Sequence, residues 1–173
     1  MSSHTSTFTV PLINAASAPN APLAAGAAAP DFTLATTAGA TVTLSGFQDQ
    51  KNVLLAFFPL AFTSTCTAEL CAFTEDFDVF SGKNVQVLPI SVDAVPSLKE
   101  FRTKYDMKVD LVSDFKREVS RAYGVLREDA FFANRAYFLI DKAGMIRWAY
   151  VEKTPGSKRE NAEIFAAIES LES

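Results

Sequence analysis

The sequence predicts a three-layer α/β sandwich, in which helices cover both faces of a mixed central β-sheet. Residues 53–58 and 85–92 are apolar runs of strand length, typical of strands that are buried on both faces. Each run is followed by a segment with helical periodicity, and a hairpin and a helix close the chain. The 173 residues suffice for one domain that buries roughly 70% of its unfolded surface.

The N-terminal part of the chain differs in composition from the rest. Residues 1–21 are first polar and then rich in Ala and Pro, so we predict a flexible extension there and a folded domain over residues 22–173. No basic residue precedes a sustained apolar core, which argues against a secretory signal. The domain opens with a predicted hairpin, because residues 32–34 and 41–44 alternate in polarity around a turn that contains Gly39.

The first apolar run leads into a helix that carries a cysteine in its first turn. Pro59 has no N–H to donate and ends the strand, and the hydroxyls of residues 63–65 can cap a helix. One apolar stripe of helical spacing then contains Cys66, Leu70, Phe73, Phe77 and Phe80. We therefore expect one helix along this stripe, with Cys66 where several backbone N–H groups lack partners.

The remaining elements alternate between strands and helices. They are a helix that starts at Pro96, a short strand at 111–112, a helix over 118–123, strands at 136–140 and 145–151 around a turn at 141–144, and a helix over 157–171. The final strands and helix complete the predicted sandwich.

Charge and composition exclude several classes of function. The net charge of -4 argues against a nucleic-acid or anionic-membrane partner, and no apolar run approaches the roughly 20 residues that span a bilayer. His4 is the only histidine and lies in the predicted extension, which argues against histidine catalysis and a His/Cys metal site. Two cysteines five residues apart cannot staple a secreted fold, so we expect a cytoplasmic protein.

Two interpretations of Cys66 follow from the residues alone. A cysteine on an apolar stripe is most often a small buried hydrophobic residue. However, a helix N-terminus favours an anion, and the hydroxyls of residues 63–65 can donate to a thiolate or to a substrate oxygen. The thiolate is the reactive form of cysteine, so these features indicate an activated thiol without naming its substrate.

Cys71 is too far from Cys66 to form a disulfide while the helix is intact. Five residues along an ideal helix separate the two α-carbons by roughly 8.6 Å, whereas disulfides rarely tolerate more than about 7 Å. Cys71 also shares the polar face with Thr74, Glu75 and Asp78. Either Cys71 is a bystander thiol, or the first helical turns unwind when the two cysteines bond.

The motifs of this segment resemble those of the peroxiredoxins. Pro59, Thr63 and Cys66 spell P-x-x-x-T-x-x-C, residues 29–32 resemble the usual opening of the family, and residues 134–141 resemble its arginine-bearing strand. The resemblance covers about residues 22–172 and implies a thioredoxin-like fold with a central mixed sheet, flanking helices and an N-terminal hairpin. Cys71 resembles the bacterioferritin-comigratory-protein (Q-type) branch. Residues 57–63 and 133–135 are more similar to the one-cysteine alkyl hydroperoxide reductase E branch.

The resemblance implies catalytic roles for particular residues. Cys66 would be the peroxidatic thiolate that becomes a sulfenic acid, and Thr63 would fix the approach of the peroxide. Arg135 would stabilise the thiolate and the charge that develops on the leaving oxygen. The backbone N–H groups of Thr65 and Cys66 would complete this anion site, and Pro59 would shield the thiolate from water.

Glu69 lies one turn after Cys66 and resembles a frequent position of the family. Its role is a further candidate, and the alternative is a solvated charge on the helix surface.

The resemblance implies a thiol-dependent peroxidase that reduces hydrogen peroxide and organic hydroperoxides. Cys71 would condense with the sulfenate, and thioredoxin or a similar thiol reductant would reduce the intramolecular disulfide. No cofactor or metal is implied, and the protein would be a monomer or a homodimer. The alternatives are a one-cysteine peroxidase recycled by an external thiol, a non-enzymatic thiol redox sensor, and a thioredoxin-like disulfide reductase. The last normally carries Cys-x-x-Cys, whereas this chain has Cys-x-x-x-x-Cys.

Overall fold

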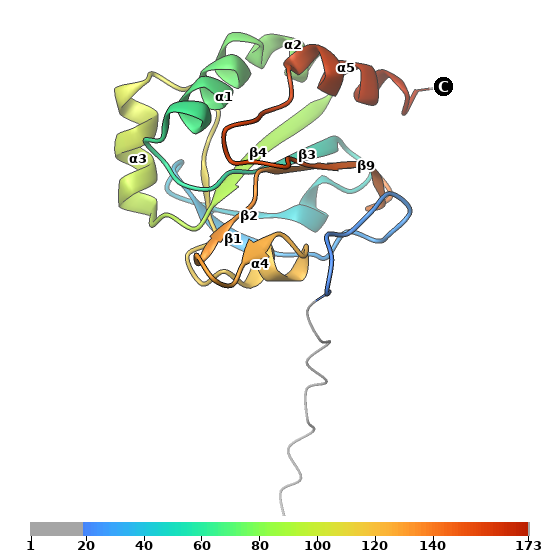
Figure 1. Cartoon of the computed structure of the whole chain (residues 1–173). Coiled ribbons are helices and arrows are strands. Elements are labelled where there is room, and N and C mark those ends of the chain that lie inside the picture. The colour runs from blue at the N-terminus through green and yellow to red at the C-terminus, as the bar shows by residue number, and fades with distance from the viewer. Residues whose placement is uncertain (1–18, 173) are drawn as a thin grey trace, which may run out of the picture.

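The computed structural model describes residues 19–172, which form a mixed sheet with helices on both faces (Figure 1). The strands are β1 (Thr33–Thr36), β2 (Thr41–Thr43), β3 (Asn52–Phe57), β4 (Val85–Ser91), β5 (Val112–Ser113), β6 (Leu126–Arg127), β7 (Phe132–Ala133), β8 (Ala136–Ile140) and β9 (Ile146–Val151). The helices are α1 (Ser64–Glu75), α2 (Phe77–Gly82), α3 (Val95–Lys104), α4 (Glu118–Ala122) and α5 (Asn161–Glu169), with a 3-10 turn, η1, at Leu44–Phe47.

Within residues 19–172, the main sheet has seven strands in the order β2-β1-β5-β4-β3-β8-β9, and β6 pairs with β7 in a separate hairpin. Strands β3, β4 and β5 run parallel, whereas β1 and β8 pair antiparallel to their neighbours. The predicted mixed sheet with flanking helices and an N-terminal hairpin is confirmed. Most of the predicted extension, residues 1–18, lies outside the described residues, so the boundary near residue 21 stays a prediction.

Two apolar clusters cover the two faces of the sheet. Side chains alternate along β3, so that Leu54 belongs to one cluster and Leu55 to the other. Helices α1, α2, α3 and α5 pack on the Leu54 face, and α4 packs on the Leu55 face (Figure 1). Both clusters are shielded from water, which explains the continuous apolar run of β3.

The register of the central strands brings distant segments together at one edge of the sheet. Parallel strands β3 and β4 end at the same edge, and Phe57 at the end of β3 pairs with Ala136 at the start of β8. Arg135, which directly precedes β8, therefore lies beside the loop that follows β3. This loop leads into α1 and its cysteine.

The predicted single helix along the Cys66 stripe is wrong, because the chain forms two helices that meet at Asp76. The Nδ2 group of Asn161 donates to the carbonyl of Ala72 at 3.0 Å and to Oδ2 of Asp76 at 2.8 Å. The carbonyl of Ala72 also accepts the backbone N–H of Asp76 at 3.1 Å, so the contact from the start of α5 adds a second donor at the end of α1. A tertiary contact thus accompanies the end of the helix.

The last helix is shorter than predicted, since α5 begins at Asn161 and residues 157–160 belong to the preceding loop. This loop is bound to the sheet by the backbone N–H of Arg159, which donates to the hydroxyl of Tyr137 at 3.0 Å. The small β6–β7 hairpin was not predicted. None of the helices in the described part of the chain has the length and hydropathy needed to cross a bilayer.

Candidate active site

The loop between β3 and α1 is fixed by hydrogen bonds in its middle and at the residue that precedes α1. The N–H of Ala61 donates to Oδ2 of Asp93 at 2.9 Å, which ties the loop to the end of β4. Thr63 is the N-cap residue of α1, but its hydroxyl donates to the carbonyl of Leu60 at 2.9 Å and caps no helical N–H. The expectation of a side-chain cap is therefore wrong for Thr63. Its hydroxyl closes the turn that precedes the helix.

Cys66 lies in the first turn of α1 and is fully buried. Arg135, 69 residues further along the chain, places its Nη2 group 3.0 Å from Sγ of Cys66. The same Nη2 group donates to the carbonyl of Pro155 at 3.2 Å. Arg135 is itself only 2% exposed, so its positive charge faces the sulfur with little screening by water.

Glu69 is 2% exposed and forms an ion pair with Arg135, with 3.1 Å between Oε1 and Nη1. Its other oxygen, Oε2, accepts a hydrogen bond from the hydroxyl of Tyr137. The alternative of a solvated charge on the helix surface is wrong, because the carboxylate lies in the protein interior. Glu69, Arg135 and Tyr137 thus form one buried group that contacts Cys66, and we call it the Glu69–Arg135–Tyr137 cluster.

Burial and charge act against each other in this cluster. Burial raises the pKa of the Glu69 carboxyl, whereas Arg135 and the Tyr137 hydroxyl act to lower it. Burial and the neighbouring Glu69 both raise the pKa of Tyr137, so its hydroxyl stays protonated and donates. Burial alone would lower the pKa of Arg135, but Glu69 and Cys66 raise it above its usual value. The guanidinium is therefore permanently charged.

A pocket of about 290 Å³ lies over the start of α1. Its lining residues are Pro59, Leu60, Thr63, Ser64, Thr65, Phe132, Arg135, Pro155 and Gly156. The structure therefore brings Pro59, Thr63, Thr65 and Arg135 to one pocket, with Cys66 in contact with the pocket residue Arg135. Sequence reasoning missed three residues of the site. Phe132 belongs to the β6–β7 hairpin, Pro155 to the loop before α5, and Tyr137 to β8.

Cys71 lies on the same helix but outside this pocket. It is half-buried, and helix α1 continues without a break between the two cysteines, which are both free thiols. Burial and the nearby Glu75 carboxylate raise the pKa of the Cys71 thiol. Within the described residues, no group of three or more His, Cys, Asp or Glu side chains could hold a metal ion.

The model of the AhpC/TSA family matches residues 25–149. The chain belongs to this family. Alkyl hydroperoxide reductase E of Mycobacterium tuberculosis (strain H37Rv) is 44% identical over 137 residues, which cover 78% of this chain and 89% of that protein. A peroxiredoxin of Thermoplasma volcanium is 33% identical over 87% of this chain and 76% of its own length.

Solved peroxiredoxins have the same fold. The reduced 2-Cys peroxiredoxin of Plasmodium vivax superposes with a TM-score of 0.80 at 30% identity and covers 87% of this chain and 83% of its own. The protein is therefore a peroxiredoxin with a thioredoxin-like fold, an oxidoreductase of the thiol peroxidase class. The predicted family is confirmed, whereas the assignment of Cys71 to the Q-type branch stays a prediction.

Proposed function

We propose that this peroxiredoxin reduces hydrogen peroxide and organic hydroperoxides with Cys66 as nucleophile, that Cys71 resolves the oxidised thiol, and that thioredoxin or a similar dithiol recycles the protein. The observation that carries the proposal is the 3.0 Å contact between Nη2 of Arg135 and Sγ of Cys66, at the first turn of a helix. A permanently charged guanidinium and the helix N-terminus both favour the thiolate.

In the first step, the thiolate of Cys66 attacks one peroxide oxygen and breaks the O–O bond. The sulfur becomes a sulfenic acid, and the departing hydroxide or alkoxide takes up a proton from water. Arg135 and the N–H groups of Thr65 and Cys66 stabilise the charge on the departing oxygen. Because the hydroxyl proton of Thr63 is engaged by Leu60, the oxygen of Thr63 accepts a hydrogen bond from the peroxide O–H.

The pocket is large enough for organic hydroperoxides as well as for hydrogen peroxide. Its volume of about 290 Å³ exceeds several-fold the roughly 30 Å³ that one water molecule occupies. Pro59, Leu60, Phe132 and Pro155 give it largely apolar walls. Organic hydroperoxides can place their alkyl group against these walls while the peroxide group faces Arg135.

Resolution requires a change of the helix. In the second step Cys71 condenses with the sulfenic acid of Cys66, which forms a disulfide and releases water. The intact α1 keeps the two cysteines apart, so its first turns must unwind before this bond forms. A dithiol reductant then exchanges with the disulfide, which returns both thiols and oxidises the reductant.

A one-cysteine cycle is the second candidate, and the separation of the two cysteines in an unbroken α1 favours it. The similar mycobacterial protein is named alkyl hydroperoxide reductase E, the branch that the segments around Thr63 and Arg135 resemble. In this cycle an external thiol attacks the sulfenic acid of Cys66 directly, and Cys71 takes no part.

Mass spectrometry of the intact protein after one equivalent of peroxide tests the proposal. A loss of about two mass units indicates the internal disulfide, and a gain of about sixteen indicates a persisting sulfenate. We expect the Cys71→Ala variant to keep the first turnover, to gain about sixteen mass units, and to lose recycling by thioredoxin. Normal steady-state turnover of Cys71→Ala would establish the one-cysteine cycle instead. Oxidation without any recycling would indicate a redox sensor.

A further inference from the structure

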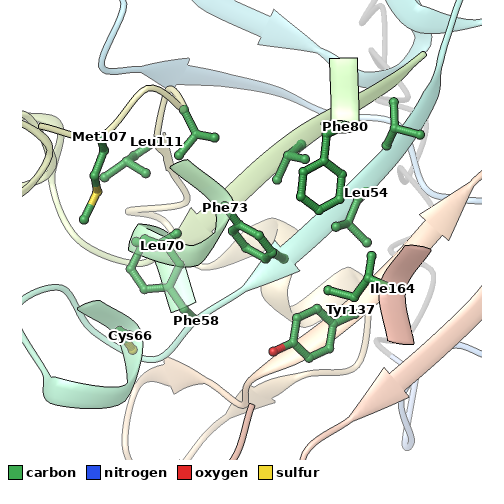
Figure 2. Packing of buried hydrophobic residues seen from close by; sticks show 14 of the residues in the cluster. Leu54, Phe58, Cys66, Leu70, Phe73, Phe80, Met107, Leu111, Tyr137 and Ile164 are labelled. Carbon is green, nitrogen blue, oxygen red and sulfur yellow. The ribbon is translucent and has the colours of Figure 1, made fainter. Parts of the chain in front are cut away.

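The hydroxyl of Tyr137 occupies a junction that the peroxidase mechanism above does not use. Tyr137 is fully buried, and its hydroxyl donates to Oε2 of Glu69 while it accepts from the N–H of Arg159 at 3.0 Å. Figure 2 shows Tyr137 within the apolar cluster below α1, with its oxygen on the side of Cys66. A single polar atom therefore joins a strand, a helix and a loop.

We propose that Tyr137 is a positioning residue, whose hydroxyl orients the Glu69 carboxylate toward Arg135 and couples this ion pair to the loop that forms one wall of the pocket. The proposal rests on the proposed function, because it concerns the same peroxide site.

The two oxygens of Glu69 have different partners. Tyr137 engages Oε2, and Arg135 lies 3.1 Å from Oε1. Two partners on different oxygens fix the rotation of a carboxylate, which a single ion pair does not. Arg135 directly precedes β8 and Tyr137 is its second residue, and both contact residues of α1. The start of β8 thus presents both partners of Glu69.

The loop of residues 152–160 is held by the same residues. Its N-terminal end is held by the N–H of Glu152, which donates to the carbonyl of Arg135 at 2.9 Å. Its middle is held by Arg135 through the carbonyl of Pro155, and its C-terminal end by Tyr137 through the N–H of Arg159. Pro155 and Gly156 line the pocket. The residues that hold Glu69 therefore also set the position of this wall.

Arg135 balances the charge of more than one neighbour. The groups that act on Glu69 are Arg135 just before β8, Tyr137 on β8 and Lys158 in the loop, and Cys66 contacts the same Arg135. Sγ of Cys66 and Oε1 of Glu69 both contact the guanidinium of Arg135, so the two groups compete for its positive charge when both are ionised. Without the hydroxyl of Tyr137, the Glu69 carboxylate is less favoured, which leaves more of the positive charge to the thiolate. The same change loosens Arg135 and the pocket wall.

The test compares Tyr137→Phe with Tyr123→Phe. Tyr123 is also fully buried and donates one hydrogen bond, to the carbonyl of Pro30 at 2.8 Å, but it lies in the cluster on the opposite face of the sheet. Two quantities are measured: the pH profile of Cys66 alkylation by iodoacetamide, followed on the Cys66 peptide, and the rate of peroxide consumption in a single turnover.

For Tyr137→Phe we expect the alkylation profile to move to lower pH by about half a pH unit or more, while the peroxide rate falls about tenfold. A role in packing alone does not produce a more available thiolate that reacts more slowly with peroxide. Tyr123→Phe should change neither quantity and lower only the denaturation midpoint. An unchanged alkylation profile in folded Tyr137→Phe would overturn the proposal.

A second comparison shows whether Tyr137 acts through Glu69. In the Glu69→Gln background, the further change Tyr137→Phe should leave the alkylation profile where Glu69→Gln alone places it. An additional shift would mean that Tyr137 acts independently, and the proposal would fail. This comparison also tests the role of Tyr137 if Tyr137→Phe alone does not fold. The double variant has no Glu69 carboxylate, so no buried charge is left without a partner. Alkylation needs no peroxide, so a wild-type protein that consumes none would sink the proposed function without affecting this comparison.

Discussion

The two cysteines share one helix but not one environment. Cys66 is fully buried at the start of α1, with the guanidinium of Arg135 3.0 Å from its sulfur. Cys71 is half-buried in the middle of the helix, where burial and the carboxylate of Glu75 raise the pKa of its thiol. One thiol thus faces a cation and the other an anion, although they are five residues apart.

The difference shows that the helix alone does not determine reactivity. The N-terminus of α1 contributes to an anion site, typically by about 0.3–1 kcal/mol. The second partner is Arg135, which directly precedes β8, and the pairing of Phe57 with Ala136 carries it to the end of β3. Sheet register therefore distinguishes the two sulfur atoms.

The largest expected effect comes from exchanging the sulfur itself. Cys66→Ser should abolish peroxide consumption, because a serine hydroxyl is not ionised near neutral pH and cannot accept the peroxide oxygen as a thiolate does. Cys71→Ser is the matched control and should retain the first turnover. Single-turnover peroxide assays measure both, and circular dichroism checks that each variant is folded. Activity retained by Cys66→Ser would remove the whole mechanism.

Removing Arg135 should have the second largest effect. Arg135→Ala should slow the oxidation of Cys66 about 100-fold and move its alkylation profile to higher pH, because the buried thiolate loses its cation. The alkylation of Cys71 should not change, so Cys71 serves as an internal reference for Cys66. Stopped-flow oxidation and peptide-resolved alkylation provide the measurements.

A suitable control is Arg121→Ala, because Arg121 is not among the residues that line the pocket and pairs with Glu128 on the surface. Arg135→Ala leaves the Glu69 charge buried without its partner, so the double variant Glu69→Gln/Arg135→Ala serves if the single variant is unstable. An unchanged profile in either Arg135 variant would mean that Arg135 does not act on the sulfur.

Much of the fold was predictable because its signals are local. The apolar runs of β3 and β4, Pro96 at the start of α3 and the turn before β9 each follow from neighbouring residues. The positions of Pro59, Thr63 and Cys66 were equally visible, since they stand within eight residues of one another.

The contacts that complete the site were not predictable from local patterns. Tyr137 occupies an apolar strand run, where its hydroxyl gives no sign of a partner 68 residues away. Glu69 is consistent with an exposed helix position until β8 is placed beside it. The end of α1 at Asp76 is accompanied by Asn161, which is distant in the sequence. In each case the deciding interaction joins segments that only the completed sheet brings together.

The smallest expected effect is the change of the free energy of unfolding with pH that the Glu69 carboxyl causes. The folded-state pKa of Glu69 lies above its ordinary value of 4.5, because burial disfavours the carboxylate. The folded protein therefore binds this proton more tightly than the unfolded chain does. The resulting stability is fully present below pH 4.5 and is lost as the pH rises through the folded-state pKa of Glu69.

Wild-type protein should therefore lose free energy of unfolding relative to Glu69→Gln as the pH rises, by about 1.4 kcal/mol per pH unit within that window. Urea denaturation of both proteins from about pH 4 to about pH 7 measures the difference. Glu128→Gln is the control of opposite sign, because Arg121 lowers the pKa of the exposed Glu128 carboxyl, so any stabilisation there is lost as the pH falls. Parallel curves for wild type and Glu69→Gln would show that burial does not control the proton of Glu69, and that the environment of Cys66 is more polar than its contacts indicate.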